Sequence, residues 1–130
     1  MNIYGIGTDI VNVKRINAVI KKNGPNFKKR IYTDFEIKTC EKRKNKAECY
    51  AKRFAAKEAL YKAVGIKKIL QFTDVEIQND SQGAPKFLIR GISLIKLRKF
   101  FKKKRFDIKL SLSDDKPWAV ATAIIFIKNK

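Results

Sequence analysis

Arg53-Phe54-Ala55-Ala56-Lys57-Glu58-Ala59-Leu60-Tyr61-Lys62-Ala63-Val64-Gly65 is the stretch that decides the fold of this chain. It has no proline, consists of good or neutral helix formers and ends on a glycine, so it predicts a helix that stops at Gly65. A step of about 100° per residue places mostly small apolar residues on one side: Ala55, Ala56, Ala59, Leu60 and Ala63. We therefore expect this helix to lie very close to whatever it packs on.

The opposite side of the helix is polar and carries Arg53, Lys57, Glu58, Tyr61 and Lys62. Glu58 is one carboxylate among three cations, and Lys62 lies one helical turn further along. Taken alone, such a pair is typical of a solvated surface ion pair worth a few tenths of a kcal/mol. A functional role for Glu58 needs support from the rest of the chain.

The composition indicates one globular domain with a large excess of positive charge. The chain has 130 residues, of which 45% are hydrophobic, enough to bury a core. It has no internal repeat, low-complexity segment or linker, so we expect a single domain over residues 1–130. Its 31 Lys and Arg outnumber its 12 Asp and Glu, giving a net charge of +19. Such a surface attracts nucleic acid, an anionic membrane, a phosphate-rich ligand or an acidic protein.

The residue types that are missing exclude several kinds of site. Because the sequence has no histidine, it can build neither a Cys/His zinc site nor a Ser–His or Cys–His catalytic pair. Its two cysteines, Cys40 and Cys49, are expected to be reduced thiols, since one continuous helix would put them on opposite sides. Asp9 interrupts the apolar N-terminal stretch, there is no basic leader, and the apolar run 118–127 is too short for a membrane helix. These features predict a soluble, cytoplasmic protein.

The hydrophobic periodicity predicts an α+β fold in which helices pack on a largely antiparallel sheet. Strands are expected over 3–9, 73–78, 86–90, 106–113 and 118–127, the last as a buried central strand because it is apolar on both faces. Helices are expected from Val13 to a stop at Asn23-Gly24-Pro25, after the capping box 33–36, along the central stretch, and over 92–104. Gly5 and Gly7 predict that another backbone approaches the first strand closely.

Asp9 and Glu58 are the polar groups that favour a catalytic interpretation. One carboxylate at a strand end and one on a helix suit Mg²⁺, which takes oxygen ligands and completes its shell with waters and substrate phosphates. Nearby Lys and Arg would neutralise the remaining phosphate charge. Spacing alone does not bring the two acids together, because any two acids can be imagined as neighbours.

Two motifs carry a family resemblance. The first is Gly5-Ile6-Gly7-Thr8-Asp9-Ile10-Val11 followed by Lys14-Arg15-Ile16, and the second is Arg53-Phe54-Ala55-Ala56-Lys57-Glu58-Ala59 with Lys62-Ala63. Together they resemble the holo-[acyl-carrier-protein] synthase family, the small one-domain 4′-phosphopantetheinyl transferases. The similarity extends over nearly the whole chain and includes Gly83-Ala84-Pro85 and Ser111-Leu112-Ser113-Asp114.

The resemblance implies a reaction and its residues. The family moves 4′-phosphopantetheine from coenzyme A to a serine of acyl carrier protein for fatty acid biosynthesis, releasing adenosine 3′,5′-bisphosphate. It implies Mg²⁺ ligands at Asp9 and Glu58, and it implies that Lys62 contacts the phosphates, which makes these three the expected catalytic residues. The residues expected to bind coenzyme A are Lys44, Arg53, Lys62, Gly65, Pro85, Lys109 and Ser111. The acidic carrier protein is expected at Lys14, Arg15 and Lys22, and the assembly is expected to be a homotrimer with sites between protomers.

The chain departs from the family pattern at two positions. Lys109 stands where the family often has histidine, and Gly65-Ile66-Lys67-Lys68 replaces a Gly-Thr-Gly segment. A lysine with an ordinary pKa is protonated at pH 7, and phosphates favour its charged form. We therefore expect Lys109 to bind phosphate and the serine proton to pass to a metal-bound water, a phosphate oxygen or Asp9.

A basic nucleic-acid-binding module is the alternative that the residues leave open. The net charge and the basic segment 96–104 favour it. Against it, the sequence shows no RNP-type aromatic motif, zinc finger or helix-turn-helix signature. Neither a membrane nor a specific nucleic acid is an expected partner.

Overall fold

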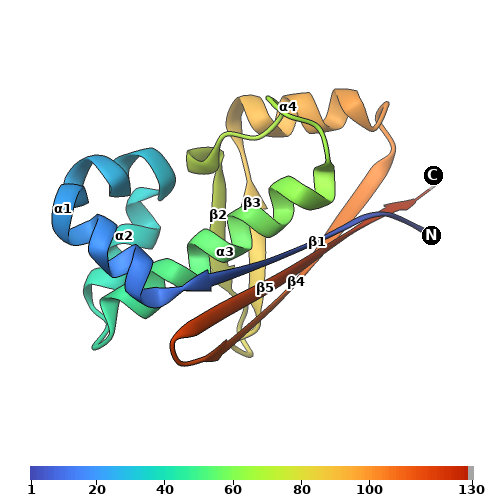
Figure 1. The fold of residues 1–130 in the computed structure, drawn as a ribbon. Helices are drawn as coiled ribbons and strands as arrows, with labels where there is room; N and C mark the ends of the chain where they lie inside the picture. The colour runs from blue at the N-terminus through green and yellow to red at the C-terminus, as the bar shows by residue number, and fades with distance from the viewer. Residues whose placement is uncertain (129–130) are drawn as a thin grey trace.

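The computed structural model describes residues 1–128, in which helices pack on one face of a three-stranded antiparallel sheet (Figure 1). The strands β1 (Asn2–Asn12), β5 (Trp118–Lys128) and β4 (Arg105–Asp115) lie in the order β1-β5-β4. The strands β2 (Val75–Asn79) and β3 (Pro85–Ile89) form a separate antiparallel hairpin. The predicted α+β class and the central place of the last strand are confirmed.

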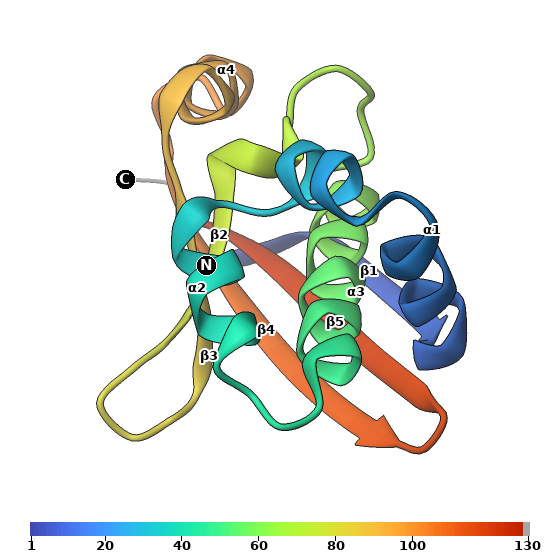
Figure 2. The same cartoon turned by 90° about the vertical axis from the view of Figure 1, so that its left-hand side faces the viewer.

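The central stretch forms α3 (Lys46–Val64), which packs against β1 and β5. Around it lie α1 (Val13–Ile31), α2 (Asp34–Glu41), the short 3₁₀ helix η1 (Phe72–Asp74) and α4 (Gly91–Phe100) (Figure 2). The helix α3 ends where the sequence predicts, because Gly65 adopts a left-handed φ of 78° and its N–H donates to the Tyr61 carbonyl. Its small apolar side is fully inside the molecule, with Ala55, Ala56, Ala59 and Leu60 at 0% exposure.

The two glycines of β1 allow α3 to lie against the sheet. A Cβ at Gly5 would overlap the carbonyl group of Ala63, and a Cβ at Gly7 would overlap that of Ala59. The predicted close approach of a second backbone is therefore confirmed, and that backbone belongs to α3. On β5 the side chains under α3 are small, Ala119, Ala121 and Ala123, and all are buried.

The other face of the three-stranded sheet is apolar and partly open. Ile6, Ile10 and Trp118 are 59%, 60% and 44% exposed, respectively. They alternate along β1 and β5 with the buried residues, and the helices lie on the opposite side of the sheet (Figure 2). We call this surface, with Val120, Thr122 and Ile124 between those residues, the open sheet face.

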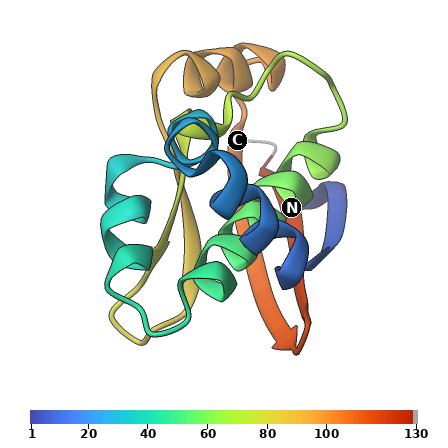
Figure 3. The ribbon, with the colours of Figure 1, turned by 60° about the vertical axis from the view of Figure 1, so that its left-hand side comes forward.

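The first helix breaks where the sequence predicts, whereas the last helix ends earlier than predicted. The first helical segment of α1 ends at Asn23 as predicted, because this residue has the non-helical angles φ −153° and ψ 48°, and a second helical segment continues beyond the bend to Ile31 (Figure 3). Pro25 is accommodated because it lies at the start of the second segment, where an N–H is not needed. The last helix ends at Phe100 rather than at residue 104, and Lys102 and Lys103 then take left-handed φ values of 53° and 64°.

The expectation of reduced thiols is also wrong, because Cys40 and Cys49 form a disulfide. The chain between them is not one continuous helix. The helix α2 ends at Glu41 and α3 begins at Lys46, so the cysteines lie on different helices with their Cα atoms 5.4 Å apart.

None of the helices within the described residues has the length and apolar character that a membrane crossing requires.

Candidate functional site

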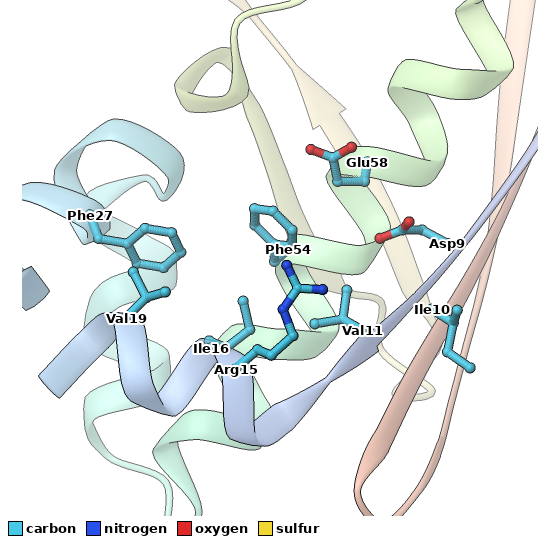
Figure 4. A pocket seen from close by; sticks show the side chains of 9 residues that line it. All are labelled: Asp9, Ile10, Val11, Arg15, Ile16, Val19, Phe27, Phe54 and Glu58. Atoms are coloured by element: carbon cyan, nitrogen blue, oxygen red, sulfur yellow. The ribbon is translucent and has the colours of Figure 1, made fainter. Parts of the chain in front are cut away.

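Asp9 and Glu58 face the same cleft because β1 and α3 pack so closely. Gly5, Gly7 and Asp9 occupy alternate positions of β1 and share the face that lies against α3. Asp9 therefore lies on the face of β1 that is turned toward α3, close to Glu58. The carboxylates of Asp9 and Glu58 line one cleft (Figure 4). The structure thus brings together the two acids that spacing alone left apart.

The two carboxylates repel each other. The pKa of Glu58 is raised above its usual value, first by burial and then by the charge of Asp9, while Lys62 acts in the opposite direction. Within residues 1–128 no third acid, cysteine or histidine joins them to form a metal-binding cluster. The pair offers oxygen ligands on one side only, as suits a cation that keeps part of its shell for water and phosphate.

The side chain of Lys62 makes its hydrogen bonds with β1 and not with Glu58, its neighbour on the helix. Its Nζ lies 3.0 Å from Asp9 Oδ1 and donates to the Thr8 carbonyl at 3.0 Å. The side chain remains 52% exposed, whereas that of Asp9 is 16% exposed. The simple surface pair Glu58–Lys62 is therefore replaced by a contact between Lys62 and the strand.

The cleft beside the carboxylates has a volume of about 340 Å³ and lies between β1, α1 and α3. Arg15 supplies its cation, and its remaining wall is apolar: Ile10, Val11, Ile16, Val19, Phe27 and Phe54 (Figure 4). Lys14 and Lys22 are exposed on α1, the same helix as Arg15. No sequence pattern indicates that Phe27 lines this wall, because Phe27 lies beyond the bend in α1.

The residues expected to bind coenzyme A are spread over several places. Lys44 lies in a separate shallow hollow with Asn17, Asn45, Lys46 and Ala47. Gly65 caps α3, and Pro85 begins β3 in the hairpin. Arg53 is only 6% exposed, and its Nη1 donates to the Cys49 carbonyl and contacts Cys49 Sγ at 3.1 Å. Arg53 Nε is buried with no hydrogen-bond partner among the described residues.

Lys109 and Ser111 lie on the opposite side of the sheet from Asp9. Ser111 pairs with Thr122, which pairs with Thr8, whereas Asp9 pairs with Ala121 on the face under α3. Lys109 is 71% exposed at its side chain, and its Nζ lies 3.5 Å from Asp107 Oδ2. Within one protomer these two residues and the carboxylate pair thus belong to different faces.

Lys57 is a buried cation beside the site, although the periodicity of the sequence puts it on the polar side of the central helix. Lys57 is 1% exposed, and its Nζ donates to Glu36 Oε1 at 2.6 Å and to the carbonyls of Ile31 and Phe72. Burial lowers the pKa of Lys57, and Glu36 opposes that shift. Glu36 also accepts the N–H of Ile77, so the network ties α1, α2, η1 and β2 to α3 next to Glu58. No feature of the local sequence distinguishes Lys57 from a solvated lysine.

Comparisons with known proteins show the family to which the chain belongs. A model of the 4′-phosphopantetheinyl transferase superfamily matches residues 5–123. The holo-[acyl-carrier-protein] synthase of Zymomonas mobilis is 44% identical over 128 residues, covering 95% of this chain and 96% of the relative.

Solved structures give the same result. The crystal structure of holo-[acyl-carrier-protein] synthase from Neisseria meningitidis has a TM-score of 0.85 at 38% identity, covering 96% of this chain and 99% of that chain. A Bacillus anthracis holo-(acyl-carrier-protein) synthase in complex with coenzyme A (3′,5′-ADP) has a TM-score of 0.75 at 35% identity, covering 95% and 96%. The chain therefore belongs to the 4′-phosphopantetheinyl transferase superfamily.

Proposed function

We propose that this protein transfers 4′-phosphopantetheine from coenzyme A to a serine of apo-acyl carrier protein. The serine oxygen bonds to the phosphorus that carries pantetheine, the pyrophosphate bond breaks, and adenosine 3′,5′-bisphosphate leaves. The observation that carries the proposal is the pair Asp9 and Glu58 in one cleft with Arg15, beside Lys62. Its relatives bear the name of this activity, and one was crystallised with coenzyme A. We place the reaction in fatty acid biosynthesis in the cytoplasm.

We propose Asp9 and Glu58 as ligands of Mg²⁺. Two repelling carboxylates and the raised pKa of Glu58 are the conditions that a bound cation relieves. When bound, Mg²⁺ neutralises charge on the pyrophosphate group of coenzyme A. The protein contributes positioning, because β1 and α3 fix the separation of the two acids before any ligand arrives.

Lys62 is placed to hold a phosphate oxygen. Its ammonium group has three N–H donors, of which Asp9 Oδ1 and the Thr8 carbonyl take two. The third donor and the exposed part of the side chain remain for a phosphate. Asp9 therefore orients Lys62 as well as serving as a proposed metal ligand.

We propose that α1 receives the acidic carrier protein. Arg15 reaches the cleft of the two carboxylates, and Lys14 and Lys22 are exposed on the same helix. A carrier bound along this helix would bring its serine toward the cleft, and its acidic residues would be attracted by these cations.

We also propose a homotrimer in which neighbours share sites. The open sheet face supports it, since exposed apolar surface on a sheet is typical of an interface between subunits. The position of Lys109 and Ser111 supports it further. Because they lie on the face opposite Asp9, the contact with coenzyme A that we propose for them would be made at the site of another protomer.

The transfer reaction is tested by incubating the protein with coenzyme A, Mg²⁺ and apo-acyl carrier protein and measuring the mass of the carrier. We expect the carrier to gain the mass of one phosphopantetheine, and this gain to require Mg²⁺. A carrier with a serine-to-alanine change at its acceptor position is the control. An unchanged carrier mass with folded enzyme would contradict the proposed function.

A further inference from the structure

A second hollow lies where α4, β4 and β5 meet, at the other end of the molecule from α1 (Figure 1). Its volume is about 590 Å³. It is lined by Leu94, Arg98, Lys103, Lys104, Arg105, Phe106, Asp107 and Lys128, none of which lines the cleft of Asp9 and Glu58. We call it the basic hollow.

The charges around the basic hollow are not compensated. Five of its residues are cationic and one, Asp107, is acidic, which leaves four positive charges in excess. Arg98, Lys103, Lys104 and Arg105 have no carboxylate of residues 1–128 within 4.0 Å, and Asp107 lies near Lys109 instead. Unpaired cations are common in this chain, which has 31 Lys and Arg against 12 Asp and Glu, so it is the gathering of five cations around one hollow that distinguishes this place. Like charges that converge on a concavity repel one another and create a local positive potential, which an anionic ligand would neutralise.

The backbone beside the hollow takes left-handed angles at the end of α4. Lys102 and Lys103 are consecutive residues with left-handed φ values of 53° and 64°, a costly conformation for any residue with a Cβ. Their N–H groups donate to the carbonyls of Lys99 and Arg98, each at 3.0 Å, so the turn is well bonded. A glycine at either position would relieve the strain. The turn is therefore the C-terminal cap of α4, and it directs Lys103 and Lys104 toward the hollow.

We propose that the basic hollow binds a compact polyphosphate, a chain of two or more phosphate groups. The cations come from the last turn of α4, the turn 101–104 and the start of β4, so they surround a volume rather than follow a line. That arrangement suits a short, highly charged anion, and two arginines add donors in the fork geometry that matches phosphate oxygens. An extended nucleic acid would instead require a stripe of cations along the surface. The hollow shares no lining residue with the cleft of Asp9 and Glu58, but its Asp107 contacts Lys109, a proposed coenzyme A ligand, so competition with coenzyme A has to separate the two sites.

The test measures binding of inorganic tripolyphosphate by calorimetry at 0.15 M salt, with coenzyme A at saturation to occupy the other phosphate site. Arg98→Gln combined with Lys104→Gln should weaken binding at least tenfold. The control, Lys38→Gln combined with Lys86→Gln, removes the same charge from exposed positions outside the hollow and should change binding less than twofold. ATP serves as a second probe: binding of ATP as tight as that of tripolyphosphate assigns the site to nucleotides, and weaker binding assigns it to free polyphosphate.

The variant Lys103→Gly distinguishes a loss of tripolyphosphate binding from a loss of stability. It removes one cation of the hollow and relieves a left-handed φ, so the variant should unfold at higher temperature than the wild type and bind tripolyphosphate several-fold more weakly. Equal weakening by the Arg98/Lys104 and Lys38/Lys86 pairs would overturn the proposal in favour of diffuse charge attraction. Loss of tripolyphosphate binding on adding coenzyme A would assign the anion to the active site instead. Tighter binding of an RNA oligonucleotide, unaffected by the hollow variants, would also overturn it.

Discussion

At the scale of one residue, the charged form of Glu58 lowers the stability of the folded protein. The raised pKa means that the folded protein binds a proton at Glu58 more tightly than the unfolded chain does. Its negative charge therefore lowers the free energy of unfolding as pH rises from the ordinary pKa of the group through the raised one, and the loss is complete above that range. This cost exists at neutral pH only while no cation is bound.

Glu58→Gln should accordingly lower the transfer rate by at least about 10²-fold while raising stability. In the absence of Mg²⁺ we expect a gain in the free energy of unfolding of up to about 1 kcal/mol, since the group is only partly buried. Thermal unfolding with and without Mg²⁺ checks this: Mg²⁺ should raise the unfolding temperature of the wild type and not of the variant. Glu48→Gln, the same change on α3 outside the cleft, is the control. Full activity of Glu58→Gln would remove Glu58 from the metal.

Lys109 lies on the open sheet face, where it pairs with Ile124, and is one of the residues proposed to bind coenzyme A. Because we expect it to bind phosphate, Lys109→Ala should raise the KM for coenzyme A more than it lowers kcat, and Lys109→His should remain active. Steady-state kinetics over a range of pH distinguish this role from proton transfer. A severe loss of kcat with an unchanged KM, together with loss of one limb of the pH profile, would make lysine the general base.

At the scale of elements, Glu41 joins the end of α2 to α1 and α3. It accepts from Tyr50 Oη at 2.5 Å and from Lys28 Nζ at 2.9 Å, and Lys46 Nζ lies 3.2 Å from its other oxygen. The hydrogen bond from Tyr50, followed by that from Lys28, lowers the pKa of Glu41 from 4.5 to about 2. Its stabilising effect is thus complete above pH 4.5 and is lost as the pH falls toward 2.

Glu41→Gln should reduce the free energy of unfolding at pH 7 by about 1 kcal/mol, a modest effect because the carboxylate is 37% exposed. Urea unfolding from pH 7 to pH 2 should show the difference from the wild type shrinking below pH 4.5. Asp115→Asn, an exposed acid with no ion pair among the described residues, should show no such trend. A difference that stays constant with pH would mean that Glu41 acts through packing alone.

The contact of β1 with α3 gives a second test at this scale. Gly7→Ala would place a Cβ against the Ala59 carbonyl, so the backbones must separate, and we expect a loss of at least about 2 kcal/mol in the free energy of unfolding. Gly24→Ala is the matched control, because its nearest neighbour would be Ile20 Cγ2 at 3.7 Å, an ordinary contact. That change should be neutral or stabilising by under about 1 kcal/mol. Denaturant unfolding of both variants distinguishes close packing from a general cost of replacing glycine.

At the scale of the whole molecule, the open sheet face determines how copies of the chain would associate. Light scattering of the wild type should give three times the mass of one chain, and Ile6→Glu combined with Ile10→Glu should give monomers, because charged side chains oppose burial of that face. An active monomeric wild type would contradict the trimer.

Shared sites predict recovery of activity on mixing two inactive variants. Glu58→Gln lacks a carboxylate on the α3 side, and Lys109→Glu reverses a charge on the open sheet face. Refolded together, they should give trimers in which some sites combine an intact Glu58 with an intact Lys109 from a neighbour. Random mixing at equal amounts should restore roughly a quarter of the wild-type rate. No recovery, with trimers confirmed by light scattering, would mean that both residues act within one protomer.

The sequence by itself determined the class of fold, the central helix with its end at Gly65, the close approach at Gly5 and Gly7, and the two motifs that identify the family. These follow from local rules: period, cap and glycine content act over a few residues. The end of the last helix at Phe100 and the disulfide between Cys40 and Cys49 did not follow, because a helix boundary depends on what packs around it.

Only the tertiary structure decided which polar residues meet. Lys57 and Glu36 are 21 positions apart, and Asp9 and Lys62 are 53 apart, so no periodic pattern relates them. The structure also divided the expected site, with Asp9 and Glu58 on the face under α3 and Lys109 on the open one. The physical reason is the alternation of a β-strand: adjacent residues point to opposite faces, and only the pairing of β1, β5 and β4 fixes which face each residue takes.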